Sequence, residues 1–148
     1  MFVTMAKYVF TPFGSAGDVN PSIWLGRLLK ARGHEVKIIT TPLFREVVER
    51  AGLEFIGIGN EEEYMAVLKH PDLWKPFKGT ELVFKLTTAA MRPFFDEIAK
   101  HVQQPGTVLV SPFHLFAARA AREKFGVPLI TMHLQPTAML SVHDETLY

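Results

Sequence analysis

Two hydrophobic periodicities alternate along the chain and predict that strands alternate with helices. Short apolar and β-branched runs are typical of buried strands, whereas apolar residues three or four apart predict amphipathic helices. We expect strands over residues 8–13, 36–40, 53–58, 107–110 and 128–132. We expect helices over residues 21–32, 43–51, 62–69, 81–104 and 115–125. Proline lacks an N–H and crowds the preceding turn, so we expect Pro93 to kink or break the fourth helix.

This order of elements predicts an α/β fold, a doubly wound, Rossmann-like parallel sheet flanked by helices on both faces. Asn20 and Pro21 indicate the start of the first helix, as its N-cap and its first helical residue. Residues 137–148 follow no strand or helix pattern and read as a polar, methionine-containing loop. We expect residues 1–148 to form a single domain, since 148 residues suffice for one sizeable core.

The composition excludes several classes of protein. With 48% hydrophobic and 21% charged residues, the chain is globular rather than disordered. Its net charge of +1 and lack of a Lys/Arg run argue against nucleic-acid binding. The absence of cysteine excludes disulfides, thiolate catalysis and zinc–thiolate sites. The sequence has neither a signal-peptide pattern nor a membrane-spanning apolar run. We therefore expect a cytoplasmic protein, which could still make weak peripheral contact with a membrane.

The loop between the first strand and the first helix carries the strongest chemical signal. In open parallel sheets, ligands bind at the carboxyl ends of the strands, where this loop lies. The loop contains one carboxylate, Asp18, and the small residues Gly14, Ser15 and Gly17. It has neither the glycine spacing of a dinucleotide fingerprint nor the Gly-Lys-Ser/Thr of a Walker A loop, which argues against an oxidoreductase. A short small-residue turn next to a helix N-terminus can still approach a phosphate closely.

Asp18 is the candidate acid–base residue of this loop. A carboxylate can take the proton of an acceptor hydroxyl if it lies about 2.6–3.2 Å from the hydroxyl oxygen. The alternative is an Asx-turn residue that only stabilises the loop. Ser15 could contact a donor phosphate or serve as a small turn residue, and Gly14 and Gly17 could satisfy backbone conformation alone.

Six histidines occur, but none is paired at the i, i+4 spacing of a helical zinc site, so we predict no metal. His114 follows the fourth strand, His133 ends the fifth, and Gln135 comes two residues later. In a parallel sheet these three residues share an edge with Asp18, which makes them candidates for a cleft. The alternative is that the histidines are structural.

Aromatic residues, including Trp74 and Phe77, are concentrated in the middle of the chain. Most aromatics at helical spacing belong to the core. The alternative is an apolar acceptor pocket, for which Trp74 and Phe77 are the candidates. Lysines lie beside these aromatics, a combination that also suits weak contact with an anionic membrane surface. They are Lys75, Lys78 and Lys85.

Residues 14–21, Gly-Ser-Ala-Gly-Asp-Val-Asn-Pro, resemble the N-terminal domain of two-domain GT-B glycosyltransferases. Trp24-Leu25-Gly26, residues 31–36 and residues 131–136 add to the likeness, which runs from about Lys7 to Thr137. The nearest resemblance is to sterol, macrolide and glycopeptide glycosyltransferases and the lipid-linked-sugar enzymes grouped with them.

The resemblance implies a hexosyltransferase that uses a nucleotide diphosphate sugar, UDP-linked by expectation, and an apolar hydroxyl acceptor. It implies that Asp18 is the general base. The small-residue turn makes Gly14, Ser15 and Gly17 the candidates to face the donor phosphates, and we expect no cofactor. The resemblance also implies a C-terminal donor-binding domain, absent from these 148 residues. We therefore expect the isolated chain to be inactive. The rival hypothesis is a free-standing ligand-binding or regulatory domain without catalysis.

Overall fold

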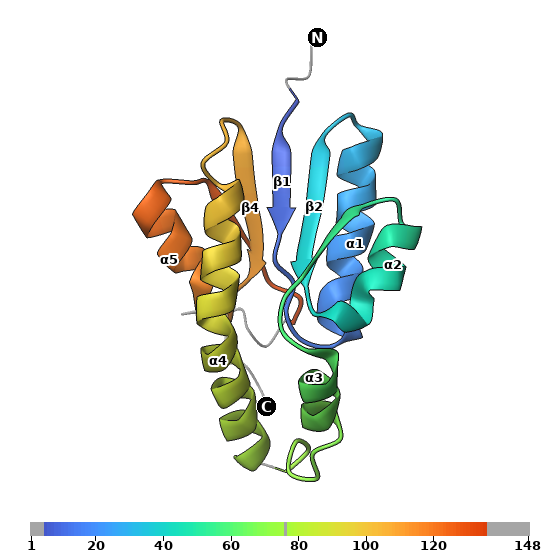
Figure 1. Cartoon of the computed structure of the whole chain (residues 1–148), viewed down its shortest axis with the longest axis vertical. Coiled ribbons are helices and arrows are strands. Elements are labelled where there is room, and N and C mark those ends of the chain that lie inside the picture. Colours follow the sequence, from blue (N-terminus) through green and yellow to red (C-terminus); the bar gives the residue numbers. More distant parts are fainter. Residues whose placement is uncertain (1–4, 76, 136–148) are drawn as a thin grey trace, which may run out of the picture.

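The structure is a computed structural model and describes residues 5–75 and 77–135, so the loop expected at residues 137–148 lies outside it. Its centre is a five-stranded sheet in the order β3-β2-β1-β4-β5 (Figure 1). All four strand pairings are parallel, which confirms the expected α/β, doubly wound sheet. The strands are β1 (Lys7–Phe10), β2 (Glu35–Thr40), β3 (Glu54–Gly57), β4 (Thr107–Pro112) and β5 (Leu129–Met132).

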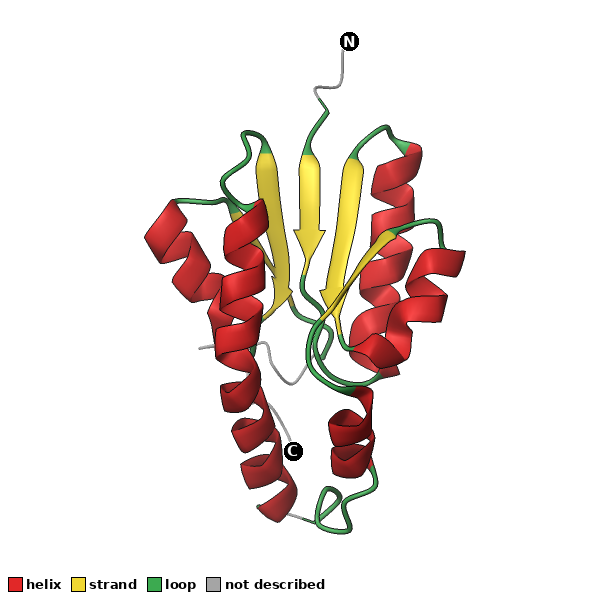
Figure 2. Cartoon of the chain, viewed as in Figure 1, coloured by secondary structure: helices red, strands yellow, loops and turns green. Residues whose placement is uncertain are grey.

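Helices connect these strands and flank the sheet (Figure 2). They are α1 (Ala16–Ala31), the short 3-10 helix η1 (Pro42–Phe44), α2 (Arg45–Arg50), α3 (Glu61–Leu68), α4 (Lys78–His101) and α5 (Phe116–Phe125). The expected break at Pro93 is wrong, because α4 continues through it. Pro93 and Ala89 are both exposed, so water can reach the Ala89 carbonyl that lacks its helical N–H partner.

Two apolar layers pack against the sheet, one on each face. In β1, Val9 packs with residues of α4 and α5, whereas the next residue, Phe10, packs with residues of α1 and α2. The same alternation holds in β4, where Leu109 belongs to the first layer and Val110 to the second. Because successive side chains of a strand point to opposite faces, the apolar runs predicted from the sequence fill both layers.

The two helices that follow β3 extend past the carboxyl edge of the sheet. In Figure 1, α3 and the N-terminal half of α4 project beyond the ends of β1, β2 and β4 and are joined at their far end by the connection between them. The expected short helix at 62–69 and long helix at 81–104 are thus confirmed, each starting slightly earlier than predicted. None of the helices described here is long and apolar enough to cross a bilayer.

Candidate active site

The cleft that contains Asp18 lies beside the central strand β1, where the chain changes from one side of the sheet to the other. The chain passes from β1 through α1 to β2 on one side of β1, and later returns through α4 to β4 on the other side. A crevice at the carboxyl ends of two such strands is the usual ligand site of open α/β sheets. A narrow cleft at this position has lining residues from both sides: Asp18, Pro112, Phe113, His114, Met132, Leu134 and Gln135. The structure therefore brings together the predicted residues Asp18, His114 and Gln135.

Asp18 lies in the first turn of α1, three residues after the N-cap Ser15. Its Oδ2 accepts hydrogen bonds from the backbone N–H of Ser15, at 2.8 Å, and from the Ser15 hydroxyl, at 3.0 Å. A carboxylate at this helix position is stabilised by the helix N-terminus as well. Among the described residues no group donates to Oδ1, so one oxygen of the carboxylate is hydrogen-bonded and the other has no donor, in a residue that lines the cleft.

The prediction that Asn20 caps this helix and Pro21 begins it is wrong, since both lie inside α1. The helix begins earlier because Ser15 and Asp18 form the capping pair of a Ser-x-x-Asp pattern, a signal that the sequence contained. Pro21 costs α1 only the hydrogen bond that would otherwise reach the carbonyl of Gly17, which is itself exposed. Gly17 is consequently a helical residue of the first turn, not a loop residue.

Gly14 leaves room for the Asp18 carboxylate. Its φ is +135°, a conformation that favours glycine. A Cβ at this position would lie 2.4 Å from Asp18 Oδ2, closer than side chains tolerate. The glycine therefore suits the turn itself, and an added Cβ would also force the Asp18 carboxylate to shift.

Tyr64, from α3, fixes the same turn from the other side. It is only 5% exposed, and its hydroxyl donates a hydrogen bond to the Gly14 carbonyl. Burial, and secondarily the negative charge of Asp18, raises the pKa of Tyr64 above its ordinary value of 10.0. Sequence reasoning did not find this role, because the two residues lie 50 positions apart and no local pattern connects them.

The two candidate histidines have different surroundings. His114 Nε2 lies 2.9 Å from the Phe13 carbonyl and must donate to it, since a carbonyl oxygen can only accept. This bond ties the loop after β4 to the loop after β1, a positioning role within the cleft. His133 is exposed, stacks on Phe113 with ring centroids 5.5 Å apart, and is not one of the residues that line the cleft.

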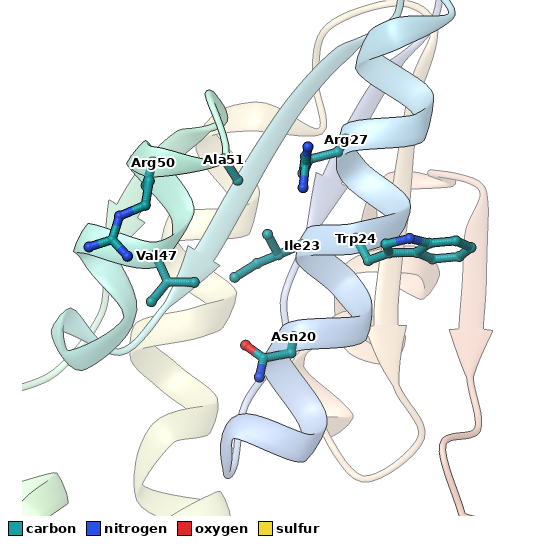
Figure 3. Close-up of a pocket in the computed structure, with 7 residues that line it drawn as sticks. All are labelled: Asn20, Ile23, Trp24, Arg27, Val47, Arg50 and Ala51. Atoms are coloured by element: carbon teal, nitrogen blue, oxygen red, sulfur yellow. The ribbon is translucent and has the colours of Figure 1, made fainter.

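The candidate acceptor residues Trp74 and Phe77 lie apart from this cleft. Both are in the connection from α3 to α4 at the far end of the projection, and their exposed fractions are 86% and 89%. A larger hollow of about 290 Å³ lies elsewhere, between α1 and α2, where Ile23 and Val47 face each other and Arg27 and Arg50 border the opening (Figure 3). Neither Asp18 nor the loop after β4 contributes to it.

Groups that could bind a phosphate lie at the start of α1. The first N–H groups of a helix have no partner within it, and the N–H groups of Ala16 and Gly17 have none among the described residues either. They point along the helix axis toward the loop, as anion-binding helix N-termini do. Ser15 is exposed beside them, although its hydroxyl is bonded to Asp18. In the described part of the chain, no group of three or more His, Asp or Glu side chains could hold a metal ion.

Comparison with known proteins identifies relatives of this domain. The profile of the glycosyltransferase family 28 N-terminal domain matches residues 8–142. A sterol 3-beta-glucosyltransferase from Pichia angusta is 28% identical over 136 residues, which cover 88% of this chain but only 10% of the relative.

Solved structures share the fold. The calicheamicin glycosyltransferase CalG4 has a TM-score of 0.68 at 21% identity, over 87% of this chain and 32% of that one. A glycosyltransferase of Streptomyces sp. SF2575 complexed with thymidine diphosphate has a TM-score of 0.58 at 16% identity, over 85% of this chain and 38% of that one. The expected likeness to GT-B glycosyltransferases is thus confirmed, and the chain spans a third or less of the CalG4 structure and of the sterol relative.

We expect Gly14→Ala to lower the free energy of unfolding by about 1–3 kcal/mol, because it combines a strained φ with a clash against Asp18. Urea denaturation followed by circular dichroism measures this loss. Gly59→Ala is the matched control, since Gly59 also has a positive φ but no atom within 4 Å of an added Cβ. Equal losses for the two variants would contradict the packing of Asp18 against Gly14.

We expect Tyr64→Phe to lower the free energy of unfolding by about 0.5–1.5 kcal/mol near neutral pH, the usual contribution of a hydrogen bond. Because the pKa of Tyr64 is higher in the folded chain than in the unfolded chain, its neutral hydroxyl contributes its full stability below pH 10. Above pH 10 this contribution falls progressively, because the unfolded chain ionises first. The difference between the parent chain and Tyr64→Phe should therefore shrink above pH 10. A difference that stays constant from about pH 8 to 11 would contradict this environment for Tyr64.

Proposed function

The chain belongs to the glycosyltransferase family 28 N-terminal domains, and from this membership we propose that it is the acceptor-binding half of a hexosyltransferase. The enzyme would transfer a hexosyl group from a nucleotide diphosphate sugar, UDP-linked in our proposal, to a hydroxyl of an apolar acceptor. The sterol 3-beta-glucosyltransferase relative supports a glucose donor and a lipid-like acceptor. A cytoplasmic location fits a sequence without cysteine, hence without disulfides.

One observation carries the proposal. At the carboxyl edge of the sheet, one oxygen of the Asp18 carboxylate accepts hydrogen bonds, and no described group donates to the other. Ser15 donates to Asp18 Oδ2, Oδ1 is the oxygen without a described donor, and Asp18 lines a cleft with residues that follow β4 and β5. A general base needs this combination, a fixed position and one free oxygen within about 2.6–3.2 Å of the hydroxyl whose proton it takes. Asp18 also supports the start of α1, so the structural and catalytic roles do not exclude each other.

The proposed reaction is a direct displacement at the anomeric carbon. The acceptor oxygen forms its bond to that carbon as its proton passes to Asp18 Oδ1. The bond from the carbon to the diphosphate oxygen breaks, and its electron pair leaves with the nucleotide diphosphate. The open N–H groups of Ala16 and Gly17 could bind a phosphate oxygen at the helix N-terminus, with Gly14 and Ser15 beside them. No metal or cofactor is part of this proposal.

A second domain of the same polypeptide would supply the donor site. The chain covers 32% of the CalG4 structure and 10% of the sterol glucosyltransferase. The thymidine diphosphate complex of the Streptomyces glycosyltransferase supports a nucleotide diphosphate as the group bound by such a protein. The cleft at the ends of β1 and β4 would then face the donor across the boundary between the two domains.

We expect the 148-residue chain alone to transfer no sugar from UDP-glucose to a sterol, and to bind the nucleotide only weakly. The reason is that the described part of the proposed site offers a donor with two phosphates only the open N–H groups at the start of α1. Release of UDP in a coupled assay tests the first point, and calorimetric titration with UDP tests the second. Turnover by the isolated chain would contradict the division into acceptor and donor halves.

In a protein that joins this chain to its donor-binding domain, we expect Asp18→Asn to lower kcat by about 10²-fold or more, the scale of a lost general base. The amide keeps the size of the side chain but cannot take the proton. Asp96→Asn is the control, because Asp96 is an exposed carboxylate of α4 paired with Arg92, away from the cleft. A folded Asp18→Asn variant with nearly normal kcat would leave Asp18 a purely structural residue and overturn the proposal.

A further inference from the structure

The hollow between α1 and α2 is a second candidate binding site, separate from the cleft at Asp18. Its volume of about 290 Å³ is near the lower end of the range for small-molecule sites, about 300–1,000 Å³. Ile23 of α1 and Val47 of α2 face each other across it, and Arg27 and Arg50 border its opening (Figure 3). A ligand in this hollow would therefore be small and would meet apolar and cationic groups together.

The core holds the two walls of the hollow. Ile23 is 6% exposed and Val48 is fully buried, and both belong to the apolar layer that joins α1 and α2 to the sheet. Gly26 brings α1 close to that layer, because a Cβ at this position would lie 3.0 Å from the Leu53 side chain. The spacing of the two helices is therefore fixed by packing beneath the hollow.

A hydrogen bond joins the two helices near their C-terminal ends. Lys30, nearly one turn after Arg27 in α1, donates from Nζ to the carbonyl of Gly52, which follows α2. The neighbour of Gly52 is Ala51, which lines the hollow. Because small-molecule sites are usually largely preformed, this tether and the packing below it favour a ligand over collapse of the hollow.

The lining of the hollow contains cations and no acidic residue. Two of its residues are arginines, Arg27 and Arg50, and none is Asp or Glu. The two glutamates of α2 pair with arginines of that same helix. From residue 19 to residue 31, α1 contains Arg27 and Lys30 and no acidic residue. In the part of the chain that the structure describes, Arg27 has no carboxylate partner, so the hollow offers a positive charge without a counter-charge.

The apolar part of the lining favours an organic ion over an inorganic one. Trp24 is 61% exposed and Val47 is 43% exposed, which leaves apolar surface in contact with water beside the buried Ile23. Covering such surface stabilises a complex roughly in proportion to the apolar area removed from water. A guanidinium, in turn, binds a planar carboxylate through two parallel N–H bonds. A ring or short chain with one carboxylate satisfies both requirements.

We propose that the hollow between α1 and α2 binds a small organic carboxylate. The apolar part of the ligand packs on Ile23 and Val47, and its carboxylate accepts hydrogen bonds from Arg27. Arg50, which also pairs with Glu46, adds positive charge at the α2 side of the opening. The site goes beyond the proposed function and does not rest on it, because no residue lines both the hollow and the cleft.

The two tryptophans provide a direct test, because each indole N–H gives its own signal in a proton–nitrogen correlation spectrum of the 148-residue chain. The spectrum of Trp74→Phe assigns the two signals. The probe is phenylacetate, a single ring with one carboxylate. We expect it to shift the Trp24 signal with saturation below about 10 mM, and to leave the signal of Trp74, which lies outside the hollow, unchanged. A Trp24 signal that does not move, or that moves without saturation, would overturn the proposal.

Two analogues of the probe separate the charge from the ring. Phenylacetamide keeps the ring without the charge, and acetate keeps the charge without the ring. We expect each to bind at least about tenfold more weakly than phenylacetate, because each loses one of the two contributions. Equal affinity for phenylacetamide would indicate an apolar hollow without anion recognition, and equal affinity for acetate a site for any anion. Either result would contradict the proposed class of ligand.

Variants of Arg27 test the carboxylate contact. We expect Arg27→Gln to weaken phenylacetate binding by about tenfold or more, the scale of a lost hydrogen bond to a charged group. Arg27→Lys keeps the charge but not the planar fork, and should weaken binding by roughly threefold. Arg122→Gln is the matched control, since Arg122 is an exposed arginine of α5, and it should leave the affinity unchanged. Equal affinities of Arg27→Gln and Arg122→Gln would remove Arg27 from the site and overturn the proposal.

Other occupants and other sites have their own outcomes. A Trp24 signal that shifts with protein concentration in the absence of phenylacetate would assign the hollow to a second copy of the chain and overturn the proposal. Asp18→Asn should bind phenylacetate like the parent chain, because Asp18 does not line the hollow. Loss of binding in this variant would place the probe in the cleft instead, which also overturns the proposal. The proposed transferase is tested by kcat of the two-domain protein, so its failure and the failure of this site are separate results.

Discussion

The capping of α1 by the Asp18 carboxylate is the interaction on which the arrangement of the cleft depends. It starts the helix at Ala16, immediately after the turn at Gly14, and it explains why that turn contains a glycine. Tyr64 and His114 then fix the carbonyls of Gly14 and Phe13 from α3 and from the loop after β4. One short turn is therefore tied to three separate parts of the fold, and the carboxylate that organises it also faces the cleft.

The order of the strands explains why the cleft lies at this turn rather than beside another strand. β1 is central, with β2 on one side and β4 on the other, and the chain leaves it in one direction and returns in the opposite one. The connections after β1 and β4 therefore diverge and leave a crevice between them. The hollow between α1 and α2 is larger, but it lies on the flank of the sheet, away from the strand ends where the polar groups converge.

Local patterns in the sequence were sufficient for the fold but not for the details of the site. Parallel strands and flanking helices follow from periodicity, and the positions of Asp18, His114 and Gln135 at one edge follow from strand order. The predicted start of α1 is wrong because it rests on Asn20 and Pro21, whereas the Ser15–Asp18 pair caps the helix earlier and Pro21 lies inside it. The bond from Tyr64 to Gly14 joins residues far apart in sequence, and only the packing of α3 against the sheet brings them together.

The turn that contains Asp18 and the α3–α4 projection differ in how firmly the core holds them. Asp18 is anchored by hydrogen bonds at the sheet edge, whereas α3 has Tyr64 as its one buried residue, and the first turns of α4 bury only Gly79 and Thr87 among described side chains. Regions with few buried apolar contacts open at lower free energy than the rest of a domain. If Asp18 acts as the proposed general base, a firmly held carboxylate beside a less firmly held projection would fix the chemistry while the projection adapts to the acceptor. Tyr64 is the residue that connects the two, since it is the buried anchor of α3 and the partner of the Gly14 turn.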